Sequence, residues 1–239
     1  MNSIYSKFSF RTAGVALGVG LATAGLSLVS GVASAATVTS LPDLTKEQFN
    51  ELNFTELFVA EGRIGNNSLN NAERELGIND KSGQPVQSAQ FVWEQGTEYD
   101  FTLNYDGSMV NYSVEGTALS SEAFSGSIDT IYIRTNETAN SNVRIDSLVF
   151  NDEALDAFSE PIDDEEDYLK ISDISEEFTL QGKVNFSWTG TQPTRSNLAY
   201  QIKVGKPVPE PLTILGSGVA LGFGALLKKE SSRRQNKVK

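Results

Sequence analysis

The sequence predicts a mainly β protein: an antiparallel, jelly-roll-like β-sandwich flanked by an N-terminal signal helix and a C-terminal transmembrane helix. Three observations lead to this prediction. Apolar and polar residues alternate with a period of two from residue 87 onward, apolar runs lie near both ends of the 239-residue chain, and basic residues flank each run. These features divide the chain into 1–35, 36–206 and 207–239.

Composition excludes catalysis by a histidine or cysteine side chain of this chain. The chain has neither residue, so it has no disulfide, no Cys/His zinc site and no Ser-His-Asp triad. Residues 36–206 hold 29 of the 31 acidic residues but only 11 of the 19 basic ones, a net charge of −18. Nucleic acid, whose phosphates need Lys and Arg, is therefore not an expected partner.

The N-terminal segment has the three parts of a secretory signal peptide. Lys7 and Arg11 precede an apolar run over 13–32, and Ala33-Ser34-Ala35 follows it. Small residues at Ala33 and Ala35 suit a signal peptidase, so we expect cleavage between Ala35 and Ala36. The alternative is an uncleaved anchor helix.

The domain at 36–206 begins with a short mixed region. Thr45 and Gln48 match a capping box, which predicts a helix at about 45–52. A first strand is expected over 56–63, and 77–85 is rich in turn residues.

From residue 87 the alternation predicts seven or more short strands, which is typical of a sandwich. Asp106-Gly107 lies between two alternating runs and predicts a hairpin joining strands 98–105 and 108–115 through a type I′ turn. Gly182 interrupts a long strand and suggests a bulge. The acidic interval 151–177 is expected to be mostly loop.

The C-terminal segment has three parts in a fixed order. Val208-Pro209-Glu210-Pro211 precedes a 16-residue apolar run at 212–227, and a basic tail occupies 228–239. The run is shorter than the ~20 residues of a typical transmembrane helix, but snorkelling lysines can close the difference. The tail would keep the C-terminus cytoplasmic through Lys228, Lys229, Arg233 and Arg234. A buried core helix with a solvated tail is the alternative.

This C-terminal arrangement resembles the PEP-CTERM sorting signal. The resemblance covers 207–239 and rests on Val208, Pro209, Glu210 and Pro211, the Gly-rich apolar run and the basic tail. It implies an exported protein of a Gram-negative bacterium or cyanobacterium that is recognised by an exosortase-type sorting enzyme. The protein would be anchored in the membrane with its domain on the periplasmic or extracellular side, or released to the cell surface after processing.

The domain itself is similar to the choice-of-anchor domains found with such signals, and most similar to the W type. The segments that carry this similarity are 58–65 (FVAEGRIG), 101–107 (FTLNYDG), 186–190 (FSWTG) and 198–204 (LAYQIKV). The resemblance implies a location at the cell surface and carries no catalytic residue.

One acidic run is a candidate calcium site. Asp163, Asp164, Glu165 and Asp167 offer the oxygens that Ca²⁺ prefers, in a run that also includes Glu166. No EF-hand pattern surrounds the run, so a solvated acidic loop is favoured over a metal site. No other cofactor is expected.

The sequence therefore predicts a non-catalytic envelope or extracellular-matrix component that interacts with polysaccharide. A lectin-like module is the first alternative, with sugars stacking on Trp93, Trp188, Tyr99, Tyr105, Tyr112 and Tyr200. Because these aromatic residues follow the alternating apolar pattern, core packing is favoured for them. A carboxylate-dependent glycoside hydrolase is the second alternative, with Glu94, Glu98, Glu115 and Glu122 as candidates.

Overall fold

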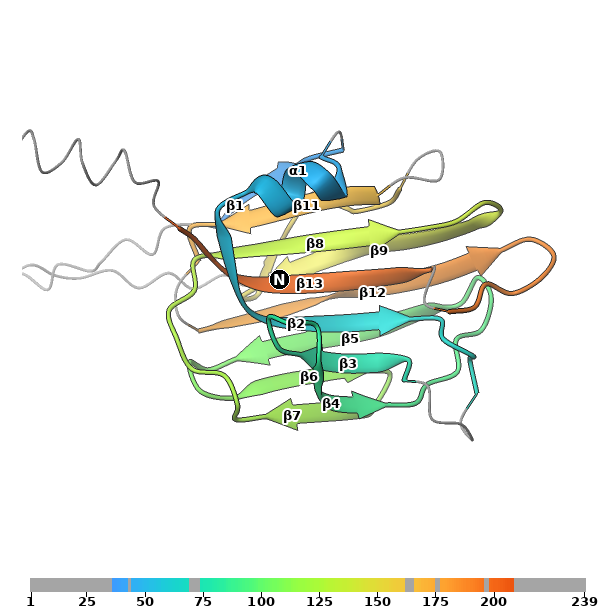
Figure 1. The fold of residues 1–239 in the computed structure, drawn as a ribbon, viewed down its shortest axis with the longest axis horizontal. Helices are drawn as coiled ribbons and strands as arrows, with labels where there is room; N and C mark the ends of the chain where they lie inside the picture. The colour runs from blue at the N-terminus through green and yellow to red at the C-terminus, as the bar shows by residue number, and fades with distance from the viewer. Residues whose placement is uncertain are drawn as a thin grey trace, which may run out of the picture. The chain divides into compact units, whose positions relative to one another are not determined.

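The computed structural model describes residues 36–208, except 43, 69–73, 162–165, 175–176 and 196–197. These residues form two antiparallel β-sheets and one short helix (Figure 1). The prediction of a mainly β protein built from antiparallel sheets is confirmed. The predicted signal and transmembrane helices lie outside the described residues. Among the residues that the structure describes, none belongs to a helix that could span a lipid bilayer.

The seven-stranded sheet has the order β1-β11-β8-β13-β2-β3-β4. Its strands are β1 (Thr37–Ser40), β2 (Phe54–Arg63), β3 (Leu76–Asn79), β4 (Pro85–Ala89), β8 (Thr130–Asn136), β11 (Glu166–Ser172) and β13 (Ala199–Pro207). The six-stranded sheet has the order β10-β9-β12-β5-β6-β7. Its strands are β5 (Glu98–Tyr105), β6 (Val110–Val114), β7 (Thr117–Ser121), β9 (Ser141–Phe150), β10 (Glu153–Ala154) and β12 (Phe178–Trp188).

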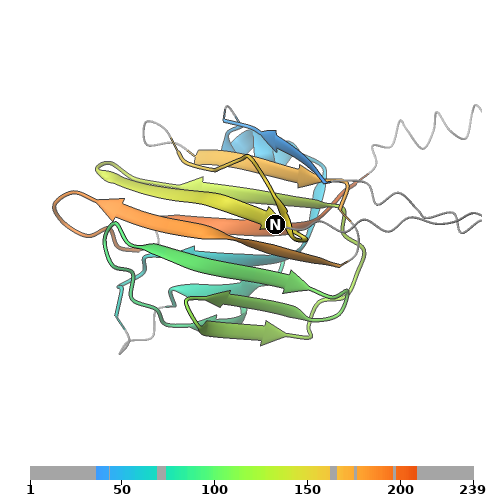
Figure 2. The same ribbon diagram turned by 180° about the vertical axis from the view of Figure 1, so that it is seen from behind.

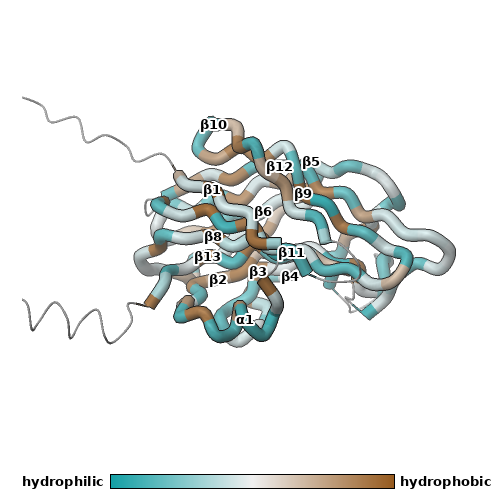
Figure 3. The backbone as a smooth tube through the Cα atoms, turned by 90° about the horizontal axis from the view of Figure 1, so that it is seen from above, coloured by the Kyte–Doolittle hydropathy of each residue, from teal (hydrophilic) through white to brown (hydrophobic). Residues whose placement is uncertain are grey.

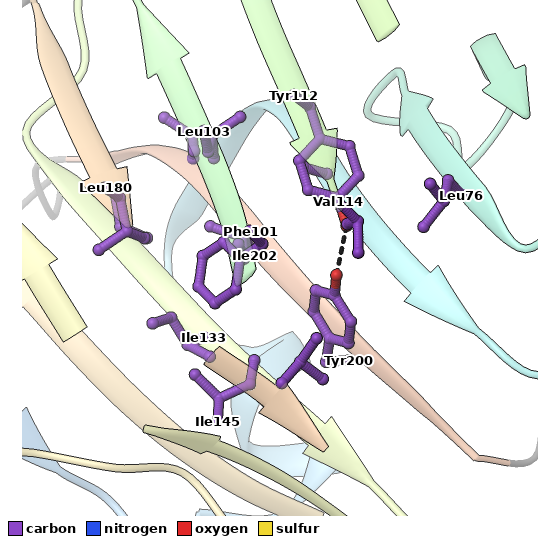
Figure 4. Packing of buried hydrophobic residues seen from close by; sticks show 14 of the residues in the cluster. Leu76, Phe101, Leu103, Tyr112, Val114, Ile133, Ile145, Leu180, Tyr200 and Ile202 are labelled. Carbon is purple, nitrogen blue, oxygen red and sulfur yellow. Dashed lines mark hydrogen bonds between the residues drawn. The ribbon is translucent and has the colours of Figure 1, made fainter. Parts of the chain in front are cut away.

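The main core lies between the two sheets, where the alternating residues of both meet. On β5 the buried positions are Tyr99, Phe101, Leu103 and Tyr105, and the residues between them are more exposed. Strand β13 repeats this pattern with Tyr200, Ile202 and Val204. Figure 4 shows Tyr200 and Ile202 among the side chains of this core. A period of two thus sends one face of each strand into the core, as the sequence predicts.

Helix α1 (Lys46–Glu51) packs on the outer face of the seven-stranded sheet. Thr45 Oγ1 accepts a hydrogen bond from the Gln48 amide, and the Gln48 side chain accepts one from the Thr45 amide, so the predicted capping box is confirmed. Phe49 is the buried residue of the helix and stacks on Tyr168 with ring centroids 5.0 Å apart. Phe49, Tyr132 and Tyr168 form a small second core beneath the helix. Figure 3 shows α1 on the opposite side of the sandwich from β10 and β12.

The Asp106-Gly107 hairpin is confirmed, but the predicted turn type is wrong. Tyr105 pairs with Val110, so four residues rather than two connect β5 and β6. Gly107 has φ +90° and Asp106 does not have positive φ, whereas a type I′ turn needs it at both central positions. Asp106 Oδ1 instead accepts hydrogen bonds from the Ser108 and Met109 amides at 3.0 and 2.7 Å, which closes the longer turn.

Gly182 is the bulge expected in β12. The register against β9 shifts between Gln181 and Lys183. A Cβ at Gly182 would lie 2.8 Å from the Phe101 ring and 2.9 Å from Leu148 Cδ2, so only glycine lets these side chains approach.

The prediction of loop over most of 151–177 is wrong for its second half. Residues 166–172 form β11, which lies between β1 and β8 in the seven-stranded sheet. Leu169 and Ile171 face the core from this strand.

Candidate functional site

Both ends of the described chain leave the sandwich on the same side, which we call the exit end. Thr37, the first residue of β1, pairs with Ser172 on β11. Ser172 pairs with Thr130 on β8, and Thr130 pairs with Gly205 on β13. The first residue of β1 therefore lies in the same cross-strand row as Gly205, which is two residues before the end of β13. Three strand spacings separate β1 from β13, about 14 Å. In Figure 1, β13 ends on the side of the sandwich where β1 begins.

Strand β13 runs directly toward the predicted sorting motif. It is the central strand of its sheet and ends at Pro207. The Val208 amide then donates a hydrogen bond to the Asn53 carbonyl at 2.5 Å. Val208 and Leu52, which precedes Asn53, are 46% and 39% exposed, so apolar side chains flank the point of exit.

Most residues of the predicted sorting segments lie outside the described part of the chain. Of the cleavage residues, Ala36 is described and packs against the main core, whereas Ala33 and Ala35 are not. Val208 is the described member of the motif. Pro209, Glu210 and Pro211 lie beyond it, as do Lys228, Lys229, Arg233 and Arg234 of the tail.

The structure does not bring the described acidic residues of the calcium candidate together. Asp163, Asp164 and Glu165 lie outside the described residues. Glu166 faces outward from β11, whereas Asp167 is buried on the other face, where its Oδ2 accepts a hydrogen bond from the Glu160 amide at 3.1 Å. Across the described ranges, no group of three or more acidic residues is placed to hold a metal ion.

A charged hydrogen-bond network, which was not predicted from the sequence, crosses the outer face of the seven-stranded sheet. Arg134 on β8 pairs with Gln201 on β13, which pairs with Glu61 on β2. Arg134 Nη1 donates to Gln201 Oε1 at 3.1 Å, and Gln201 Nε2 donates to Glu61 Oε2 at 3.2 Å. We call these three residues and their partners Arg74, Glu166 and Tyr168 the polar ladder.

The two ends of the polar ladder are ion pairs. Arg74 donates through Nε and Nη2 to Glu61 Oε1, at 3.2 and 3.1 Å. At the other end Arg134 Nη2 donates to Glu166 Oε1, and the Tyr168 hydroxyl donates to Glu166 Oε2 at 2.9 Å. Each carboxylate of the ladder therefore has a cation and at least one neutral donor.

The electrostatics of the polar ladder favour ionised carboxylates. Burial alone would raise the pKa of Glu61, but hydrogen bonds from Asn79 and Gln201 and the charges of Arg63 and Arg74 outweigh it, so the pKa lies below its usual 4.5. The pKa of Glu166 is likewise lowered, because Arg134 and Tyr168 outweigh its burial. A general acid needs the opposite shift, so the ladder is suited to holding strands together.

Glu75 is a second, fully buried carboxylate, and it accepts hydrogen bonds from backbone amides. Its Oε1 accepts hydrogen bonds from the Asn66 and Asn67 amides, and its Oε2 accepts one from Phe91. Glu75 thereby connects the segment after β2 to the segment before β5. Neither Glu61 nor Glu75 is among the site residues predicted from the sequence. A charged residue within an apolar strand, as in Val59-Ala60-Glu61, is the signal that could have found Glu61, and Glu75 has no such signal.

The candidates for sugar binding and glycoside hydrolysis are dispersed. Five of the six aromatic residues considered for stacking are buried in the core, and Trp188 is half-buried; the buried five are Trp93, Tyr99, Tyr105, Tyr112 and Tyr200. The four glutamates considered for hydrolysis are all exposed; they are Glu94, Glu98, Glu115 and Glu122. Core packing, favoured by the sequence for the aromatic residues, is confirmed for the buried five.

A shallow groove of about 390 Å³ lies beside α1, near the exit end. Its lining includes Phe49, Leu52 and Phe54 from the α1 region and Lys81 from the turn after β3. The groove carries one carboxylate, Glu56, which accepts a hydrogen bond from Lys203 Nζ at 2.7 Å. Since that carboxylate is already paired, the groove offers no acid–base pair for hydrolysis.

Comparison of the chain with protein-family models gives no match, and comparison with curated proteins gives none either.

Proposed function

We propose that this chain is an exported surface protein, anchored in the membrane by its C-terminal segment and non-catalytic. The observation that carries the proposal is the common exit of both chain ends. A signal peptide before Ala36 and an anchor after Pro211 would both meet the membrane at the exit end of the sandwich.

The short connection between domain and anchor supports this proposal. Only Val208-Pro209-Glu210-Pro211 separates the end of β13 from the apolar run at 212–227. Four residues span at most about 14 Å when fully extended. The exit end would therefore lie at the membrane surface, with Leu52 and Val208 close to the headgroups and the strands directed away from the bilayer.

The proposed role of the domain is that of an envelope or extracellular-matrix component that interacts with polysaccharide. A PEP-CTERM-like signal and a choice-of-anchor-like, jelly-roll-like domain are part of this proposal, with an exosortase-type enzyme as the sorting partner. Support for a non-catalytic role comes from the carboxylates themselves: the buried ones among the described residues, Glu61, Glu75 and Asp167, are engaged by cations or backbone amides.

The proposal is tested by expressing the full chain in a Gram-negative host that has the sorting enzyme. We expect the protein in the membrane or cell-surface fraction, with Ala36 as its first residue by N-terminal sequencing. In spheroplasts, added protease should digest the domain while a cytoplasmic control protein survives. A protein that keeps Met1 and stays in the cytoplasmic fraction would overturn the proposal.

A further inference from the structure

Among the described residues, no helix covers the outer face of the six-stranded sheet, whereas the outer face of the other sheet carries α1 (Figure 2). Part of this uncovered face differs from the rest of the domain in its charge. Eight outward positions on β7, β6, β5 and β12 form two adjacent cross-strand rows. The first row is Ser120, Asn111, Asn104 and Thr179, and the second is Ala118, Ser113, Thr102 and Gln181.

None of these eight residues is charged, and seven carry a hydroxyl or an amide; we call them the neutral face. The next row is charged: Asp100 on β5 pairs with Lys183 on β12, and Lys183 pairs with Asp146 on the neighbouring strand β9. In a domain of net charge −18, an uncharged area spanning four strands is a local exception. Its hydroxyls and amides can form hydrogen bonds with an uncharged partner, and it has no charge that would attract a charged one.

Hydrogen bonds within the first row orient two neighbouring amides in opposite senses. Ser120 Oγ donates to Asn111 Oδ1 at 2.7 Å, which leaves the Asn111 Nδ2 to donate outward. Asn104 Nδ2 donates to Thr179 Oγ1 at 3.0 Å and to the Phe178 carbonyl at 3.3 Å, which leaves the Asn104 Oδ1 to accept. Asn111 and Asn104 are direct cross-strand partners.

The row therefore presents a donor beside an acceptor at the spacing of cross-strand neighbours, about 5 Å between Cβ atoms. Adjacent hydroxyls of a sugar ring take this combination, because each hydroxyl can both donate and accept. Among the described residues, no protein group occupies either the Asn111 Nδ2 or the Asn104 Oδ1.

We propose that the neutral face binds an uncharged polysaccharide laid across the strands. The inference rests on the proposed function and adds to it the binding surface and the class of glycan. Adjacent strands repeat at about 4.8 Å, close to the length of one pyranose unit in an extended chain. Each of the four strands would therefore meet one sugar of the polymer.

In the anchored protein, the rows of the neutral face would also have a defined orientation relative to the membrane. Its rows run across the strands, and the strands lead toward the exit end, so the bound polymer would run parallel to the membrane surface. The face has no exposed aromatic side chain for stacking, so the affinity of one domain is low. Many anchored copies on one polymer would supply the retention.

The test uses the full chain purified in detergent and four solid-phase probes: cellulose, curdlan and mannan, which are uncharged, and alginate, which is anionic. The variant is Asn111→Asp, which keeps the oxygen that accepts from Ser120 and replaces the outward amide donor with an acceptor. Gln87→Ala on the exposed edge strand β4 is the matched control.

We expect the wild-type chain and Gln87→Ala to bind at least one uncharged glycan equally, and Asn111→Asp to bind it about tenfold more weakly. Thermal unfolding should show the same Tm for all three. Three results would overturn the inference: binding to alginate only, equal binding by Asn111→Asp, or no binding to any uncharged probe. A change of oligomeric state in Asn111→Asp would also overturn it, since the face would then be an interface between copies of the chain.

These outcomes are separable from those for the proposed function. A chain that is exported, cleaved at Ala36 and membrane-bound but binds no uncharged glycan would overturn the neutral face alone. A chain that binds glycan through Asn111 but remains cytoplasmic in the host would overturn the proposed location and leave the binding surface standing.

Discussion

The hydroxyl oxygens of Tyr112 and Tyr200 lie 2.5 Å apart and form a hydrogen bond between the two sheets (Figure 4). Tyr112 is on β6 and Tyr200 on β13, and both rings are almost completely buried. Burial raises the pKa of Tyr112 well above 10 and also raises that of Tyr200, so the protonated form of both hydroxyls is favoured.

Removing one of these hydroxyls should cost more than removing both. Tyr112→Phe or Tyr200→Phe leaves the other hydroxyl buried without its partner, and we expect a loss of about 1–3 kcal/mol in the free energy of unfolding. The double variant should be clearly more stable than the sum of the two losses predicts. Urea unfolding of the four proteins measures this double-mutant cycle. Additive losses would contradict a direct bond between the hydroxyls.

The polar ladder should make stability depend on pH through Glu61. Because the folded pKa of Glu61 is lower than its unfolded value, its contribution is fully present above about pH 4.5 and is lost as pH falls through the folded pKa. We expect the free energy of unfolding to fall less between pH 6 and pH 3 in Glu61→Gln than in the wild type. Glu122→Gln, at an exposed position, is the control. Identical pH profiles for Glu61→Gln and the wild type would refute the prediction.

Gly205→Ala should disrupt the pairing of β13 with β2 near the exit end. A Cβ at Gly205 would lie 2.1 Å from the Thr55 carbonyl oxygen, which is backbone and cannot turn away. We expect a loss of about 1–3 kcal/mol or more. Gly77→Ala is the matched control, since its nearest neighbours are side-chain atoms at 3.1 Å or more. If both variants unfold at the same denaturant concentration, the close approach of Gly205 to the Thr55 carbonyl does not contribute to stability, and the prediction is wrong.

Sorting and membrane retention should respond to different residues of the C-terminal segment. Pro209 and Pro211 disfavour helix, so the motif should stay extended where a sorting enzyme can reach Glu210. We expect Glu210→Ala to block processing and leave insertion intact. Changing Lys228, Lys229, Arg233 and Arg234 to Gln should instead weaken retention and orientation.

These variants are compared by apparent mass and by membrane fraction in a host with the sorting enzyme. The chain with unaltered motif and tail is the reference in the same host. Processing of Glu210→Ala at the wild-type level would show that the motif is only a linker.

Local sequence patterns were enough to predict much of the strand content. The alternation around Asp106-Gly107 predicted β5 and β6, and Thr45 with Gln48 predicted the start of α1, because hairpins and helix caps depend on residues close together in the chain. The predicted turn type between β5 and β6 was wrong because the Asp106 side chain accepts hydrogen bonds from two backbone amides and so stabilises a longer connection.

Long-range pairing decided what the local patterns did not. Residues 166–172 lie in the acidic interval 151–177, which was predicted to be mostly loop. They form β11 because β1 and β8, both distant in the chain, pair with them on either side. The candidate sites share this origin: the polar ladder joins β2, β8, β11 and β13, and the neutral face joins β5, β6, β7 and β12.

By itself, the sequence determined the mainly β class, the acidic charge and the expected signals at the two ends, because these follow from composition, period and order along the chain. Only the tertiary structure decided that both ends leave the sandwich together, that Glu61 meets Arg134 through Gln201, and that Asn111 lies beside Asn104. The physical reason is strand register. A shift of one residue would turn each of these side chains to the opposite face of its sheet, and register is set by the packing of the whole core.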